Sequence, residues 1–326
     1  MKATHKLKPL LRLVERGTAF ISKPLINEVK HDIDALNKQF SILNHLQFSI
    51  DKGGFVVANI NNAYAKARIS TYAGQVLSYQ PHSEAEDLVF LSNKAKYKSG
   101  KAIRGGVPIC WPWFGNDISG LGRASHGFVR NQQWEIISTN QDSNGVIKLI
   151  FGLNATEYTR TIWPHDFELR LEISVGKDLQ LKLNTKNTGH TEMAITQAIH
   201  TYFNVSDIEK TTVTGLDSVE YQDKLKGFSK GTQSGNVHIS QEIDRIFQPV
   251  NDDVMIVDSG FNRTITLSAT GSKTTVIWNP WTTAVSDLSS KHYHHFLCVE
   301  TANAANDSVT LLAGESHSMS VAYRVC

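Results

Sequence analysis

The stretch 167-Phe-Glu-Leu-Arg-Leu-Glu-Ile-Ser-Val-175 decides the fold class, because apolar and polar residues alternate along it without a break. Residues 179–183, Leu-Gln-Leu-Lys-Leu, alternate in the same way after a short turn at residues 176–178. Successive side chains of a strand point to opposite faces, so this pattern gives each strand one buried face and one wet face. The two stretches therefore predict a β-hairpin.

The period of two recurs from about residue 46 to the end of the chain. Turn clusters at residues 142–145 and 232–236 separate the repeats, and no linker rich in Pro, Gly or Ser divides them. Many strands with few helical stretches predict an all-β fold, an antiparallel sandwich or barrel. Further strands are expected at residues 55–60, 63–71, 76–80, 88–92, 146–153, 264–269, 275–278, 296–300 and 319–325.

Helical spacing is confined to the part before residue 46, where Leu25, Val29, Ile33, Leu36 and Phe40 recur at steps of three and four. We therefore expect a helical extension over residues 1–45 and a β domain over residues 46–326. The first 22 residues carry five basic side chains against one glutamate. They fit either an amphipathic helix that packs on the main domain or a partner, or an organellar transit peptide.

Composition excludes several classes of protein. The 326 residues are 40% hydrophobic and 20% charged, as in globular proteins, and the net charge of +2 gives no basic field for nucleic acid. No apolar run approaches the roughly 18 residues that span a bilayer. Three cysteines without a CxxC pair argue against a disulfide framework or a zinc site. They fit a reducing compartment, so we expect a cytoplasmic protein that binds neither nucleic acid nor membrane.

The densest segment is 103-Ile-Arg-Gly-Gly-Val-Pro-Ile-Cys-Trp-Pro-Trp-Phe-Gly-115, which predicts a stiff, irregular loop. Arg104 opens this loop, and the planar fork of an arginine suits a phosphate group. The faces of Trp111 and Trp113 suit the apolar faces of a pyranose ring. They would equally suit a loop that is packed by its own aromatic side chains.

Four shorter segments carry polar residues that could serve a site. His126 and Arg130 flank a Gly-Phe turn in residues 125–134, and His200 lies within the strand-like residues 196–203. Asp244 could bind a sugar hydroxyl or pair with its neighbour Arg245. Glu300 ends an apolar strand, where an ionised carboxylate is costly unless it has a partner or a task. Each histidine and arginine could also be an ordinary packing or surface residue.

A metal site was considered at residues 292–295, His-Tyr-His-His. His292 and His294 would lie on the same side of an extended segment. No carboxylate or cysteine adjacent in the sequence completes a ligand set, so we expect a solvated loop and no metal.

Taken in order, these segments resemble the glucose-6-phosphate 1-epimerase family, the hexose-6-phosphate mutarotases, within the galactose-mutarotase-like superfamily. The resemblance covers roughly residues 46–325. The Arg-Gly-Gly-Val-Pro-Ile-Cys-Trp-Pro-Trp-Phe-Gly loop and the His-Gly-Phe-Val-Arg-Asn segment are the most specific motifs. The Gln-Ala-Ile-His, Glu-Ile-Asp-Arg-Ile-Phe, Trp-Asn-Pro-Trp and Cys-Val-Glu runs agree in order and approximate spacing. The resemblance implies one large antiparallel β-sandwich with the sugar site on one concave face.

The resemblance also implies roles for particular residues. His200 matches the family's catalytic histidine and Glu300 its catalytic glutamate. Arg104 and Arg130 match its substrate-binding arginines, and Asp244 matches its substrate-binding aspartate.

The chain departs from the family pattern at two positions. Ser125 stands where a substrate-contacting glutamine is usual before the His-Gly pair, so that contact is shortened or lost. Phe247 stands where tyrosine is common, which removes one hydroxyl. We nevertheless include Ser125 and His126 among the expected substrate contacts.

The implied reaction exchanges the α and β anomers of a hexose 6-phosphate, with glucose 6-phosphate as the expected substrate. Glu300, ionised at its ordinary pKa, would be the base, and His200 would be the acid. No metal, nucleotide or other cofactor is required. Three alternatives remain: a 1-epimerase of free aldoses, a glycosidase that uses Asp244 with Glu300, and a sugar-phosphate-binding module without turnover.

Overall fold

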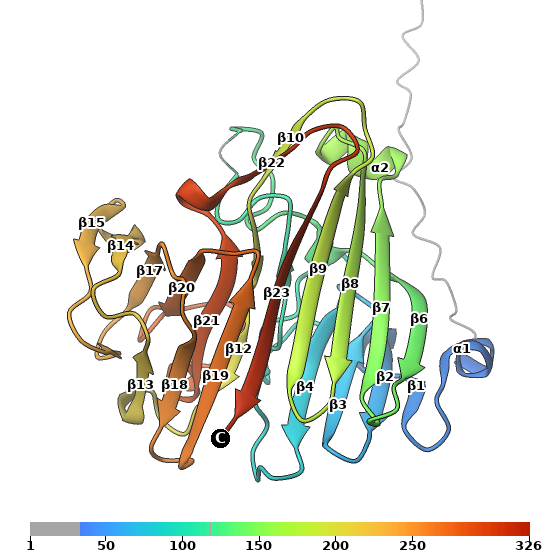
Figure 1. Cartoon of the computed structure of the whole chain (residues 1–326), viewed down its shortest axis with the longest axis horizontal. Coiled ribbons are helices and arrows are strands. Elements are labelled where there is room, and N and C mark those ends of the chain that lie inside the picture. The colour runs from blue at the N-terminus through green and yellow to red at the C-terminus, as the bar shows by residue number, and fades with distance from the viewer. Residues whose placement is uncertain (1–32, 118) are drawn as a thin grey trace, which may run out of the picture. The chain divides into compact units, whose positions relative to one another are not determined.

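Antiparallel strands dominate the part of the chain that the computed structural model describes, residues 33–117 and 119–326 (Figure 1). Every ladder between two named strands in this part is antiparallel. The strands form sheets of nine, eight, four and two strands. The expected all-β antiparallel fold is therefore confirmed.

The nine-stranded sheet runs across Figure 1 and contains the hairpin that the sequence predicts. Its strands, in spatial order, are β16 (Val237–His238), β13 (Thr211–Thr214), β18 (Val254–Asp258), β19 (Arg263–Thr270), β23 (Ser316–Val325), β9 (Leu179–Asn187), β8 (Phe167–Val175), β7 (Ile147–Asn154) and β6 (Glu135–Gln141).

The eight-stranded sheet carries most of the residues singled out from the sequence. Its order is β15 (Ser229–Thr232), β14 (Glu220–Asp223), β17 (Ile243–Phe247), β20 (Thr274–Asn279), β21 (Phe296–Asn303), β11 (Gln197–Ile199) and β5 (Ile109–Cys110), and β12 (Tyr202–Asn204) also pairs with β21.

Two smaller sheets, two α-helices and six short 3₁₀-helices complete the regular structure of the described residues. The four-stranded sheet is β1 (Leu46–Ile50), β2 (Val56–Asn61), β3 (Ala65–Ser70) and β4 (Gln75–Pro81), and the two-stranded sheet is β10 (Met193–Ile195) with β22 (Val309–Leu311). The α-helices are α1 (Ile33–Phe40) and α2 (Glu157–Ile162). Neither helix is long and apolar enough to cross a bilayer.

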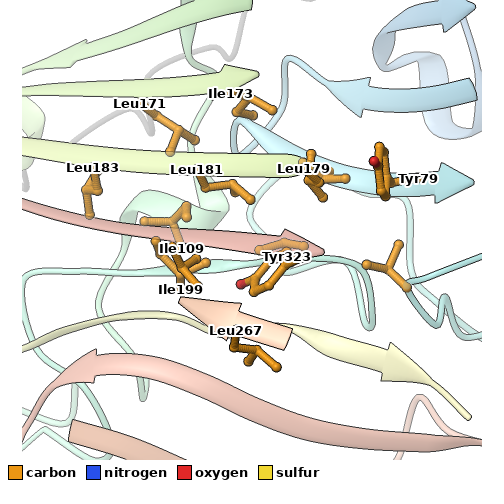
Figure 2. Close-up of a cluster of buried hydrophobic side chains, with 14 of the residues drawn as sticks. Tyr79, Ile109, Leu171, Ile173, Leu179, Leu181, Leu183, Ile199, Leu267 and Tyr323 are labelled. Atoms are coloured by element: carbon orange, nitrogen blue, oxygen red, sulfur yellow. The ribbon is translucent and has the colours of Figure 1, made fainter. Parts of the chain in front are cut away.

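The core lies between the sheets, because each sheet turns one face inward. Strand β8 alternates buried and half-buried residues along its whole length. Figure 2 shows its Leu171 and Ile173 beside Leu181 of β9 and, from the eight-stranded sheet, Ile199 of β11. Full burial of one such side chain stabilises the fold by about 1.5–3 kcal/mol.

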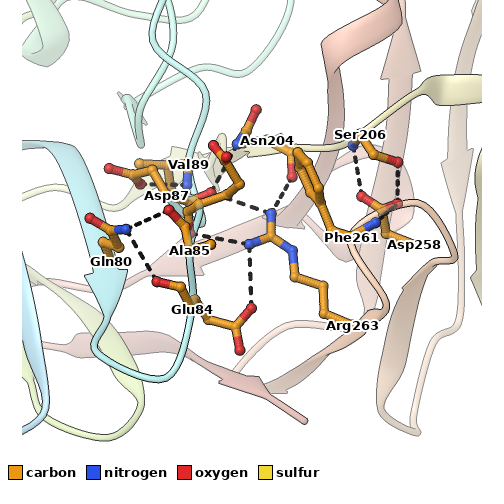
Figure 3. A network of polar contacts seen from close by, with 11 residues as sticks. Gln80, Glu84, Ala85, Asp87, Val89, Asn204, Ser206, Asp258, Phe261 and Arg263 are labelled. Atoms are coloured by element: carbon orange, nitrogen blue, oxygen red, sulfur yellow. Dashed lines mark hydrogen bonds and ion pairs between the residues drawn. The ribbon is translucent and has the colours of Figure 1, made fainter.

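Arg263 ties the two large sheets together at one end (Figure 3). Its guanidinium is buried and donates to the carbonyl of Asn204, at the end of β12, over 2.6 Å. It also donates to the carbonyls of Glu86 and Asp87, over 3.4 and 3.3 Å. A residue of β19 thus fixes the end of a strand in the neighbouring sheet.

Most strand predictions agree with the structure within a few residues, and the hairpin at residues 167–183 is confirmed. The strand expected at residues 88–92 is wrong. Val89 bridges to Phe203 and Leu91 bridges to Gly105, so the segment touches two different neighbours and forms no continuous ladder.

The helical prediction is confirmed for residues 33–40, whereas residues 41–45 form a turn in which Ile42 bridges to Leu46. Ile33, Leu36 and Phe40 lie in or at the end of α1 and pack against the core. The side chain of Asn37 bonds the backbone N–H and carbonyl of Phe48, over 2.7 and 2.9 Å, and so fixes the helix to β1. Leu25, Val29 and the basic first 22 residues lie outside the described residues.

Candidate active site

The register of the eight-stranded sheet places His200 directly opposite Glu300. Ile199 pairs with Thr301 on one side of the histidine, and Tyr202 pairs with Cys298 on the other. Continuing this register puts position 200 against position 300. Directly opposed residues of an antiparallel pair share one face. His200 Nε2 accordingly lies 3.4 Å from Glu300 Oε1, and both side chains are more than nine-tenths buried.

One row of paired residues extends this site across the sheet. Asp244 pairs with Trp278, and Cys298 pairs with both Trp278 and Tyr202, so all four side chains share the face of His200 and Glu300. Residues at alternate positions, such as Ile199 and Val299, enter the core. The polar groups of the site therefore share one face of the sheet, where apolar side chains such as Val276 and Ile246 pack beside them.

The loop at residues 103–115 is fastened beside this face by backbone hydrogen bonds. The N–H of His200 donates to the carbonyl of Pro108 over 2.9 Å, and the N–H of Tyr202 donates to the carbonyl of Gly106 over 3.0 Å. Gly106 has φ +62°, and a Cβ there would lie 2.1 Å from the carbonyl oxygen of Val76. Glycine is thus required for the loop to reach the histidine.

Arg104 is held from two sides. Its Nε donates to Asp287 Oδ1 over 2.9 Å, and its Nη1 donates to the hydroxyl of Tyr202 over 2.8 Å. The ring of Tyr202 stacks on the ring of His200, with centroids 5.0 Å apart and planes at 7°. Asp287 was not singled out from the sequence, since no local pattern links it to an arginine 183 positions away.

The guanidinium of Arg130 has an N–H donor that no atom of the described residues accepts. Its Nη2 donates to the carbonyl of Ser125 over 2.9 Å, but its buried Nε has no partner. The Ser125 hydroxyl donates to Asn116 Oδ1 over 2.9 Å. His126 has φ +65°, which is rare for a residue with a side chain, and its ring lies edge-on to His200 with centroids 5.6 Å apart.

Asp244 pairs with Lys224, a residue that no sequence motif identifies. Its Oδ2 lies 2.7 Å from Nζ of Lys224, in the turn between β14 and β15. The expected alternative, a pair with Arg245, is wrong, because Arg245 contacts Asp223 over 3.4 Å. Arg245 and Asp244 are consecutive in a strand and point to opposite faces.

Burial pulls the two central groups toward their uncharged forms. It raises the pKa of Glu300 well above its usual range, an effect that the charges of Lys224 and Arg130 oppose in part. Burial also lowers the pKa of His200 well below its usual range. The charges of Arg130 and Arg104 lower this pKa further, which indicates that both arginines lie near the imidazole.

The two tryptophans of the loop do not form a sugar platform in this structure. Trp111 is fully buried and packs against Phe128, Trp163 and Phe167. Trp113 stacks under the guanidinium of Arg123, 4.1 Å from the ring centroid. The alternative interpretation, in which the aromatic side chains of the loop serve to pack it, agrees with the structure. The aromatic rings that do contact His200 include Tyr202, which stacks on it, and Trp278, which lies edge-on to it.

Two clusters could be considered for a metal ion. His294 Nδ1 lies 3.5 Å from Asp207 Oδ1, so a carboxylate does approach the histidines of the 3₁₀-helix His292–His295, contrary to the sequence analysis. A tighter group is His200, Cys298 and Glu300, which offer one ligand atom each, all within 4.8 Å of one another.

Comparisons with known proteins show the family of the chain. A family model described as aldose 1-epimerase matches residues 56–324. A relative from Salmonella typhimurium, named "Putative glucose-6-phosphate 1-epimerase", is 37% identical over 249 residues, 75% of this chain and 82% of the relative. A relative of the same name from Cenchrus ciliaris is 36% identical over 263 residues, 76% of this chain and 78% of the relative.

Solved structures share the fold. A crystal structure from Salmonella typhimurium, described as "a putative mutarotase", has a TM-score of 0.81 at 32% identity and covers 91% of this chain and 99% of its own. A galactose mutarotase-like protein from Clostridium acetobutylicum has a TM-score of 0.68 at 15% identity, over 86% of this chain and 98% of its own, which shows the fold alone. With the family model matching most of its length, the chain belongs to the aldose 1-epimerase family.

Proposed function

We propose that the protein exchanges the α and β anomers of a hexose 6-phosphate, with glucose 6-phosphate as the expected substrate. The observation that carries the proposal is the contact between His200 Nε2 and Glu300 Oε1, 3.4 Å apart, on the polar face of the sheet. Ring opening needs one group that accepts a proton and one that donates a proton. A positioned acid and base each supply roughly 10²–10⁴-fold in rate.

The proposed steps balance with these two groups alone. Glu300 takes the proton from the anomeric hydroxyl while His200 gives a proton to the ring oxygen, and the C1–O5 bond breaks. The resulting aldehyde turns about the C1–C2 bond. The same two proton transfers then run in reverse as the ring oxygen attacks the other face of C1.

The proton must be on His200 before the first step. Burial favours the opposite distribution in the ligand-free protein, with the proton on Glu300, because it raises the pKa of the carboxyl and lowers the pKa of the imidazole. A bound phosphate dianion would stabilise the imidazolium and offset the nearby arginine charges. Substrate binding therefore moves one proton across the 3.4 Å contact.

The phosphate would bind at the arginines. Arg130 is the stronger anchor, since its buried Nε has no partner in the protein. Arg104 can contribute fewer donors, because Asp287 and Tyr202 already accept from it. Charge-assisted hydrogen bonds of this kind contribute about 1.5–3 kcal/mol each. Asp244 and Lys224, an acceptor and a donor side by side, would then face sugar hydroxyls.

One observation favours a second candidate, a 1-epimerase of free aldoses. The ion pair between Arg104 and Asp287 neutralises one of the two arginines that a phosphate would use. Anomer exchange measured by saturation-transfer NMR on glucose 6-phosphate and on glucose separates the two candidates. We expect faster exchange of the phosphorylated sugar. Faster exchange of glucose would favour the second candidate, and no exchange of either would favour a binding module.

We also propose a cytoplasmic location. The cysteines support it, since Cys110, Cys298 and Cys326 are all free thiols. N-terminal sequencing of the native protein tests it, and a processed start well after Met1 would contradict it.

A further inference from the structure

The thiol of Cys298 is a fully buried polar group that anomer exchange does not use. It lies two residues before Glu300 on β21, so the two side chains share one face of the strand. Together with His200 it completes a group of nitrogen, sulfur and oxygen atoms within 4.8 Å of one another. Cys110 is also fully buried but is not part of this group.

The spacing of the group fits tetrahedral coordination. Bonds of about 2.0–2.2 Å from zinc to nitrogen and to oxygen place those two ligands about 3.3–3.5 Å apart. His200 Nε2 and Glu300 Oε1 are 3.4 Å apart, so the distance between these two atoms already matches that between two ligands of a tetrahedral zinc ion. The sulfur of Cys298 lies within 4.8 Å of the other two ligand atoms, and tetrahedral coordination of zinc would bring it to about 3.6 Å from each of them.

Unpartnered atoms at the same place point independently to a ligand. His200 Nδ1 and Glu300 Oε2 are buried and have no hydrogen-bond partner. Both side chains are more than nine-tenths buried. Buried polar atoms are normally satisfied, so the unpartnered Oε2 leaves the carboxylate of Glu300 with capacity for a bound group, whereas Nδ1 lies across the ring from the Nε2 that would bind the cation.

We propose that His200, Cys298 and Glu300 form a three-ligand site for a thiophilic divalent cation of the zinc class, and that the cation inhibits the enzyme by occupying its acid–base pair. The mixture of imidazole, thiolate and carboxylate selects zinc-like ions over magnesium or calcium, which prefer oxygen ligands. The thiol proton of Cys298 and the carboxyl proton of Glu300 both leave to solvent when the cation binds, because only the deprotonated groups ligate the metal. The metal has no part in anomer exchange.

Cobalt(II) gives a direct test on the full chain, without turnover. Wild type titrated with Co²⁺ alone should develop a thiolate-to-cobalt charge-transfer band and the strong visible bands of a tetrahedral ion. The charge-transfer band should be lost in Cys298→Ala and kept in Cys110→Ala and Cys326→Ala. Absence of the band in wild type, or its loss in Cys326→Ala but not in Cys298→Ala, overturns the proposal.

Inhibition by Zn²⁺ gives the second readout. Zinc should compete with the sugar phosphate and be reversed by a chelator. Cys298→Ala should need about 10–100-fold more zinc for half inhibition, the usual cost of disturbing a metal site. His294→Ala is the matched control for the exposed histidines and should stay as sensitive as wild type. Equal sensitivity of Cys298→Ala and wild type would show that zinc acts elsewhere. The cobalt spectra remain informative even if anomer exchange is not the activity.

Discussion

At the scale of the residue, the account depends on where one proton lies. In the free protein the buried imidazole of His200 should be neutral at pH 7, since burial lowers its pKa. In the complex with glucose 6-phosphate it should carry a proton on both nitrogens. Nitrogen-15 NMR of histidine-labelled protein distinguishes these forms. If His200 is neutral in the saturated complex, the assigned roles are wrong, and Glu300 is the acid and His200 the base.

The central residues differ in how far the sequence could identify them. His200 and Glu300 were found through their motifs, and the shared face of Cys298 and Glu300 follows from their spacing of two. Lys224 and Asp287 could not be found this way. Each acts through one ion pair with a residue far along the chain, and such a contact leaves no local pattern.

At the scale of the element, the loop at residues 103–115 should tolerate no side chain at Gly106. Gly106→Ala places a Cβ 2.1 Å from a backbone oxygen, so the loop must shift away from His200. We expect a loss of about 1–3 kcal/mol of stability and reduced exchange. Thermal unfolding and saturation-transfer NMR measure the two effects.

Gly100→Ala is the matched control for the loop. Gly100 also has a positive φ, +76°, but nothing lies within 4 Å of the added Cβ. This variant should lose only the stability that a positive φ costs an alanine, and it should keep its activity. Equal effects of both variants would mean that the close approach to Val76 is unimportant.

The tie between the two large sheets gives a second prediction at this scale. Arg263→Met removes the donor of three part-buried hydrogen bonds to backbone carbonyls. The carbonyl of Asp87 keeps a second donor in the side chain of Asn204, so the loss falls on the carbonyls of Asn204 and Glu86, and each buried hydrogen bond left unmade costs about 1–3 kcal/mol. Arg324→Met removes an exposed ion pair and should have little effect on the free energy of unfolding. Urea denaturation measures the free energy of unfolding of both variants, and equal losses in the two would contradict the role of Arg263.

Sequence patterns predicted the strands best where a strand has one buried face and one solvent-exposed face. The alternation in residues 167–175 gave β8 with its observed bounds. The segment at residues 88–92 has strand-like composition, but its neighbours are set by tertiary contacts with Phe203 and Gly105. Propensity alone cannot show that a ladder is interrupted by a change of partner.

At the scale of the whole molecule, the preference for a phosphorylated sugar should depend on the arginines. Arg130→Gln should lower kcat/KM for glucose 6-phosphate by about 10–100-fold, since one or two charge-assisted bonds are lost. Arg104→Gln should have a smaller effect, because Asp287 and Tyr202 already engage Arg104. Turnover of free glucose should change far less in both. Equal losses with both sugars would make the arginines structural.

The central claim is that His200 and Glu300 act as one acid–base unit, and a double-mutant comparison tests it most directly. Exchange of the anomers of glucose 6-phosphate is measured by saturation-transfer NMR in wild type, His200→Ala, Glu300→Gln and the double variant. Each single change should lower the rate by about 10²–10⁴-fold, and the double variant should lose little more, because a unit fails when either member is removed. Near wild-type exchange in either single variant, or losses that multiply in the double variant, would contradict the account.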